Sequence, residues 1–128
     1  MFEQDYIMRL IKEMVRALLK LLFNINTESP TAELLNDESE AKETLDKLLD
    51  LVDNGSINQA ENELYELLSQ QSMVNLEIAL LFYSYLNDKE DKFLEEHNFS
   101  REEIKMGLKY ATSQYGLSNI AEMFLTEL

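Results

Sequence analysis

The spacing of apolar residues predicts that this chain is built from helices. When residues 76–86 are wound with a helical period, apolar side chains occupy nearly the whole circumference, and only Glu77 and Ser84 interrupt them. Leu and Ala dominate the segment and β-branched residues are few, which favours a helix over a strand. A helix that is apolar almost all round is typically buried. We therefore expect residues 76–86 to form the central helix of a small domain.

Residues 1–24 predict one long amphipathic helix. The centre of its apolar stripe follows helical spacing and consists of Ile7, Ile11, Met14 and Leu18. Further apolar residues widen the stripe on both flanks: Tyr6, Leu10, Ala17 and Leu21 on one, and Met8, Val15, Leu19 and Leu22 on the other. The polar arc between the flanks is narrow and contains Arg9, Lys12, Arg16 and Lys20.

This apolar arc is wider than a single packing partner would cover. Burying one large apolar side chain stabilises a protein by roughly 1.5–3 kcal/mol, so leaving a whole flank in water would forfeit much of a domain's net stability. We therefore predict that the N-terminal helix contacts another molecule and serves as an oligomerisation element. The predicted interaction surface consists of Met8, Val15, Leu19, Leu22, Tyr6 and Leu10.

Turn signals divide residues 30–128 into further helices. Ser29 as an N-cap and Pro30 at the first helical position predict a second helix that runs to about Asp53, with a break at residues 36–37 left open. Gly55 is expected to end this helix. Ser56 and Gln59 predict a capping box at the start of the next one.

The second half of the chain carries the clearest helix start. Residues 87–98 are acidic and prone to turns, and a capping box of Ser100 and Glu103 follows them, with Phe99 and Ile104 as the hydrophobic staple. Gly116 is expected to end that helix, and a last helix follows. Six helices without a credible strand predict an all-α fold, a small helical bundle in a single domain of residues 1–128.

Composition and charge narrow the function classes. Apolar residues at 45% and charged residues at 28% are typical of a globular domain. The absence of cysteine, of a signal-peptide pattern and of any run long enough to span a bilayer indicates a cytoplasmic protein. The formal net charge of −14 argues against nucleic-acid binding, which depends on Lys and Arg.

Residues 50–61 match several positions of a calcium-binding EF-hand loop. The third position, which should donate an oxygen ligand, is Val52. A helix–helix turn ending in Gly55 accounts for the segment without a metal, so we expect neither a metal nor a cofactor here.

No set of residues predicts catalysis. His97 is the only histidine and lies in an acidic loop, so neither a Ser/His/Asp triad nor a Glu-x-x-His metal motif can be assembled. Glu77 is the one carboxylate in an apolar setting, and we interpret it as part of a narrow polar line along which the central helix faces solvent. The tyrosines at helical spacings are interpreted as core and rim residues, with a ligand groove lined by them as the alternative: Tyr65, Tyr83, Tyr85, Tyr110 and Tyr115.

Two resemblances support this reading. Residues 55–60, followed by Leu64 and Leu67-Leu68, resemble the junction between the two helices of a tetratricopeptide repeat, which implies one helical hairpin. The chain as a whole is similar to a family of short, acidic, all-helical bacterial proteins of unknown function. That similarity rests on residues 5–9, 79–83 and 95–104 and implies no activity.

The function expected from the sequence is a non-catalytic helical protein–protein interaction module. Its partner is another protein or a second copy of the chain in a homodimer, contacted through the N-terminal helix. The alternative is a peripheral membrane protein that uses the basic arc of this helix, although the acidic remainder of the chain makes a membrane partner the weaker prediction. A calcium-binding or enzymatic helical protein is a distant third.

Overall fold

The computed structural model describes residues 2–36 and 38–125, and over these residues it contains helices and no strand. The elements are α1 (Phe2–Phe23), a short 3-10 helix η1 (Ala32–Leu34), α2 (Glu40–Asp53), α3 (Ile57–Leu68), α4 (Met73–Asn87), α5 (Asp91–Glu96), α6 (Arg101–Ser113) and α7 (Ser118–Leu125). The prediction of an all-α bundle is confirmed. The described part of the chain has one α-helix more than expected, because the acidic segment after α4 folds into the short α5 around buried Leu94.

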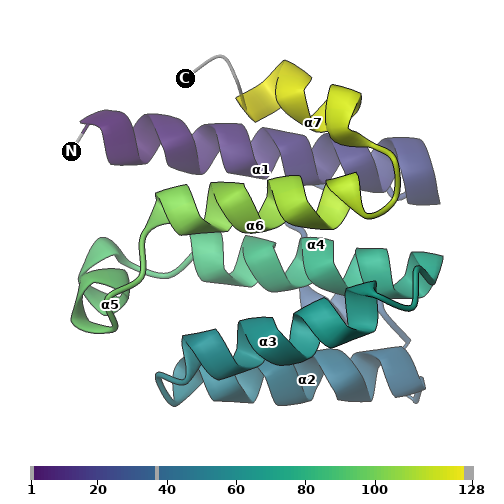
Figure 1. Ribbon diagram of the computed structural model, residues 1–128, viewed down its shortest axis with the longest axis horizontal. Coiled ribbons are helices and arrows are strands. Elements are labelled where there is room, and N and C mark those ends of the chain that lie inside the picture. Colours follow the sequence, from purple (N-terminus) through teal and green to yellow (C-terminus); the bar gives the residue numbers. More distant parts are fainter. Residues whose placement is uncertain (1, 37, 126–128) are drawn as a thin grey trace.

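Helix α4 is the centre of the bundle, as its sequence predicts. It packs against α1, α2, α3 and α6, which lie around it in Figure 1. Ser84 is buried as well, and its Oγ donates a hydrogen bond to the Pro30 carbonyl oxygen at 3.2 Å. Glu77 is half-buried, so the predicted polar line is only partly open to solvent.

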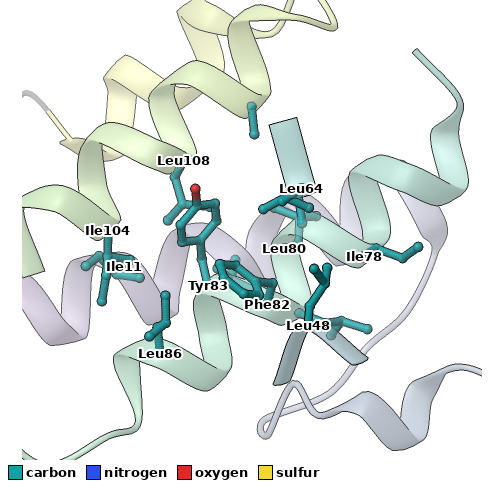
Figure 2. Close-up of a cluster of buried hydrophobic side chains, with 14 of the residues drawn as sticks. Ile11, Leu48, Leu64, Ile78, Leu80, Phe82, Tyr83, Leu86, Ile104 and Leu108 are labelled. Atoms are coloured by element: carbon teal, nitrogen blue, oxygen red, sulfur yellow. The ribbon is translucent and has the colours of Figure 1, made fainter. Parts of the chain in front are cut away.

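The core forms one continuous cluster around this helix. Figure 2 shows Leu80, Phe82, Tyr83 and Leu86 of α4 among side chains contributed by the surrounding helices. Tyr83 extends from α4 toward α6, next to Leu108. Its hydroxyl group therefore lies between α3 and α6, beside Glu61 and Gly107.

The segment between α1 and α2 differs from the prediction. No helix begins at Pro30; instead Ser39 caps α2, its side chain accepting a hydrogen bond from the Lys42 backbone nitrogen at 3.1 Å. Pro30 is buried, and its carbonyl is held on α4 by Ser84. This bond between distant residues holds the segment at Pro30 against α4, and the segment connects α1 to α2 with one 3-10 turn. Of the expected break at residues 36–37, position 37 lies outside the described residues.

Helices α2 and α3 form the predicted hairpin. Gly55 has φ +88°, and the amide nitrogens of Ser56 and Gly55 donate to the carbonyls of Leu51 (2.8 Å) and Val52 (2.9 Å). These two bonds form a Schellman motif, which ends α2 as expected. The capping box predicted from Ser56 is wrong, because the Ser56 side chain makes no cap bond.

The capping box of α6 is confirmed. Ser100 Oγ accepts from the Glu103 amide at 3.2 Å, and Glu103 Oε2 accepts from the Ser100 amide at 2.9 Å. Phe99 and Ile104, the two staple residues, are both buried. The first turn of α6 is thus fixed by residues close together in sequence.

Helix α1 is covered by its own chain on more faces than we expected. It packs against α4, α6 and α7, and Figure 1 shows α7 lying along it. Val15 and Leu19 have no exposed surface, which corrects their assignment to an interaction surface. The physical reason is that three helices, rather than one, divide the wide apolar arc among them.

The other four residues of that predicted surface keep some exposure. Met8, Leu10 and Leu22 are half-buried and Tyr6 is 45% exposed. Within residues 2–36 and 38–125, no helix combines the length and the apolar character that crossing a bilayer requires.

Candidate functional site

A groove of about 410 Å³ lies between α3 and α6 and combines acidic and aromatic side chains. Helix α3 contributes Glu61 and Tyr65, four residues and therefore about one turn apart. Helix α6 contributes four residues at helical spacings: Glu103, Met106, Gly107 and Tyr110. Both helices pack against α4 and flank it in Figure 1.

Glu61 is held in place by two tyrosine hydroxyls. Its Oε2 accepts a hydrogen bond from Tyr83 Oη at 2.6 Å and one from Tyr65 Oη at 3.3 Å. Burial raises the pKa of Glu61; the two tyrosine bonds act in the opposite direction, and the nearby charge of Glu103 raises it further. Glu61 is therefore a partly desolvated carboxylate with a fixed orientation.

Gly107 allows Tyr83 to reach Glu61. A Cβ atom at position 107 would overlap with the Tyr83 ring and hydroxyl, so a side chain there would displace the tyrosine. Burial raises the pKa of Tyr83 far above its ordinary value, so its hydroxyl keeps its proton and acts as a donor. The contact between Tyr83 and Glu61 therefore requires a glycine in the middle of α6.

Two tyrosines form the aromatic part of the groove. The rings of Tyr65 and Tyr110 lie 4.7 Å apart between centroids and are tilted by 57°. Tyr110 is 41% exposed and the neighbouring Met106 is 64% exposed. An exposed aromatic ring beside a flexible thioether is a surface on which apolar parts of a ligand can pack.

The charged side chains that line the groove in the described part of the chain are acidic. Glu61 and Glu103 reach it from different helices, and none of the described residues that line it is basic. Such a site can accept hydrogen bonds and attract cations. Among the described residues, no serine, cysteine, lysine or histidine lines it.

A second hollow, between η1 and α4, is less available for an acidic ligand. The lysine that lines it is already engaged: Lys89 Nζ lies 2.7 Å from Asp53 Oδ1, and Tyr85 Oη donates to the same oxygen at 2.7 Å. The Lys89 ammonium also lies 4.8 Å from the centroids of both the Tyr85 and Phe93 rings. The α3–α6 groove is therefore the stronger candidate site.

The structure assigns the EF-hand-like segment a different role. Glu61, its last residue, directs its carboxylate to Tyr83 and Tyr65. Over the described residues there is no group of three or more acidic, histidine or cysteine side chains placed to hold a metal ion. His97 Nδ1 lies 2.8 Å from the Phe93 carbonyl oxygen, and the ring packs against Gly55.

The sequence alone did not assemble the groove. Of the five tyrosines for which core and rim positions or a groove were expected, Tyr83 is a core residue, and Tyr65 and Tyr110 line this groove. The signal lay in two spacings, Glu61 to Tyr65 and Glu103 to Tyr110, each of which places its residues on one helix face. What the sequence lacked was the position of α3 relative to α6.

The family model of a family of unknown function (DUF6483) matches residues 1–116 of the chain. The matched range contains every groove residue named above. Neither the curated proteins nor the solved structures contain a significant match.

Proposed function

The chain belongs to the family of unknown function DUF6483, and from this premise we propose that it is a non-catalytic helical module that binds a partner protein in the α3–α6 groove. The observation that carries the proposal is the composition of this groove. Two carboxylates, Glu61 and Glu103, stand beside the exposed side chains of Met106 and Tyr110. A site of this kind favours binding over bond-breaking chemistry.

The chemistry of the groove selects a basic partner segment. The net charge of −14 attracts positively charged partners and repels acidic ones. Apolar contact with Met106 and Tyr110 would supply affinity, since aromatic residues at the centre of an interface contribute disproportionately to binding. The partner we propose is therefore a peptide segment with a basic side chain flanked by apolar ones.

The surface of α1 supports self-association or membrane binding less well. Tyr6 and Leu21 are 45% and 66% exposed, but they lie 15 positions apart, which is roughly 22 Å along a helix. Single exposed apolar residues are common on monomers. The centre of the α1 apolar stripe, which insertion into lipid would need, is buried inside the bundle.

A peptide selection tests the proposal. We expect that a random peptide library displayed on phage and panned against the full chain yields peptides that bind with micromolar affinity. Their affinity should fall at least tenfold with Met106→Lys, which places a like charge beside a basic ligand in the groove. The matched control is Met73→Lys, an exposed methionine at the start of α4 and outside the groove.

Two results would contradict the proposal. One is that no peptide is enriched over the bare support. The other is that the enriched peptides bind the Met106→Lys and Met73→Lys variants equally well, which would place their site elsewhere.

A further inference from the structure

We propose that the groove recognises an arginine side chain of the partner, whose guanidinium lies between Glu61 and Glu103. This inference rests on the proposed function and specifies the group that the groove binds. Two carboxylates line the groove together with apolar and aromatic surface, and none of the described residues that line it is basic.

Both carboxylates are oriented before a ligand arrives. The hydrogen bonds of Glu61 fall on Oε2, where Tyr83 donates at 2.6 Å and Tyr65 at 3.3 Å. Glu103 is held by the Ser100 amide, also through Oε2, at 2.9 Å. Side chains fixed in this way lose little conformational freedom on binding, which leaves more of the interaction energy for the ligand.

Two carboxylates from different helices line the same groove and offer acceptors to one planar cation. Arginine presents five N–H donors in a planar fork and can donate to two separate acceptors at once. The ammonium of lysine is a compact, strongly hydrated charge, and removing its water is costly in a partly buried site. Glu61 is half-buried and its Oε2 is bonded to the Tyr83 and Tyr65 hydroxyls, so this end of the groove is partly shielded from water. The less strongly hydrated cation is favoured there.

The remaining groove surface fits the rest of an arginine side chain. Guanidinium planes stack on aromatic faces, and Tyr110 offers a ring that is 41% exposed. The methylene stem of arginine packs on apolar surface while its head keeps polar contacts, and Met106 provides such a surface. A bare metal ion fits less well, because calcium takes six to eight oxygen ligands.

Titration of the full chain with small probes tests the inference. The probe is N-acetyl-arginine methylamide, followed by ¹H–¹⁵N NMR of the labelled protein. We expect saturable shifts of the amide signals of Tyr65, Gly107 and Tyr110. The lysine analogue should bind several-fold more weakly, and the citrulline analogue, which has the same shape without the charge, should cause no saturable shift.

Charge-neutral variants locate the binding group. Glu61→Gln and Glu103→Gln should each weaken binding of the arginine probe about tenfold, which corresponds to about 1.4 kcal/mol. Glutamine at position 103 still completes the capping box, so α6 is expected to stay folded. The matched controls are Glu63→Gln on α3 and Glu102→Gln on α6, two exposed acidic residues outside the groove that should leave binding unchanged.

The inference and the proposed function fail in different ways. If peptides selected on the groove bind equally well after their arginine is replaced by citrulline, the module stands and arginine recognition is overturned. If the arginine probe shifts the same signals in the Glu61→Gln and Glu103→Gln variants as in the wild type, recognition by this carboxylate pair is also overturned. Absence of any groove-binding peptide contradicts the proposed function itself.

Discussion

Gly107 of α6 lies directly against the Tyr83 side chain of α4, so close that a methyl group on Gly107 would overlap with the tyrosine hydroxyl. A glycine inside a helix costs about 1 kcal/mol relative to alanine. Here the absence of a side chain lets Tyr83 pass under α6 and reach Glu61. The contact therefore joins the centre of the bundle to the candidate binding site.

Replacing this glycine should destabilise the protein despite the gain in helix propensity. We expect Gly107→Ala to lower the free energy of unfolding by about 1–3 kcal/mol, the usual cost of overpacking a core. Urea denaturation followed by circular dichroism measures the change. Met106→Ala, at the exposed neighbouring position, should change stability by less than about 0.5 kcal/mol.

A double-mutant cycle assigns this cost to the Tyr83 contact. Tyr83→Leu shortens the side chain, so Gly107→Ala should destabilise the Tyr83→Leu protein less than the wild type. Additive effects of the two substitutions would show that the cost of alanine arises elsewhere.

Burial of the second apolar flank of α1 leads to a further prediction. Leu19→Ala should destabilise the chain by about 2–5 kcal/mol, because Leu19 is fully buried and truncation leaves a cavity. Leu21→Ala, two positions along the same helix at a side chain that is 66% exposed, should have little effect. Thermal or urea unfolding of the two variants makes the comparison. Equal stability of the two would mean that α1 is packed differently.

The pKa of Glu61 predicts a pH-dependent term in stability. Because burial raises this pKa in the folded state above its ordinary value of 4.5, the folded protein holds the Glu61 proton more tightly than the unfolded chain. Stability should therefore rise, relative to Glu61→Gln, as the pH falls from neutral toward 4.5. The groups facing Glu61 are Tyr83, Tyr65 and Glu103.

Removing a hydrogen-bond donor should strengthen this effect. The Tyr65 hydroxyl lowers the pKa of Glu61, so Tyr65→Phe should raise that pKa and make the stability of the protein rise at a higher pH. Unfolding curves across the acidic range for wild type, Tyr65→Phe and Glu61→Gln give the answer. Parallel pH profiles for wild type and Glu61→Gln would contradict the assignment.

Arg101 fixes the junction of three helices. Its Nη2 donates to the carbonyls of Asn87 at 3.0 Å and Lys89 at 2.7 Å, and its Nη1 pairs with Asp91. We expect Arg101→Gln to destabilise the protein by about 1.5–3 kcal/mol, because hydrogen bonds from a charged group are lost at a buried position.

The control for Arg101 is an ion pair nearer the surface of the same helix. The Nζ atom of half-buried Lys105 lies 3.5 Å from Oε2 of exposed Glu102, and Lys105→Gln should change stability by less than about 1 kcal/mol, because ion pairs open to solvent on one side contribute little. Calorimetric unfolding compares the two variants. A similar loss for both would show that Arg101 is not a structural anchor.

Features set by neighbouring residues were predictable from the sequence. The capping box of Ser100 and Glu103, the end of α2 at Gly55 and the buried central helix depend on spacings of a few residues. The segment before α2 could not be predicted in the same way. Its conformation depends on the bond from Ser84 to the Pro30 carbonyl, 54 positions apart in the chain.

The candidate site could not be predicted from the sequence either, because contacts between residues far apart in the chain build it. Glu61 and Tyr83 are 22 positions apart and lie on different helices, and Gly107 comes from a third. Helical periodicity places each residue on a face of its own helix without stating which faces meet. The same limit explains the wrong prediction for Val15 and Leu19. Periodicity places them on an apolar flank of α1, but it does not show that other helices of the same chain bury this flank.

The packing of α1 has a consequence for how the protein is made. All the helices that cover it, α4, α6 and α7, follow it in the chain, and α7 ends at Leu125. The apolar stripe of α1 is therefore synthesised before the three helices that cover it. It stays uncovered in the nascent chain until these helices have emerged from the ribosome, and exposed apolar surface promotes aggregation during that interval.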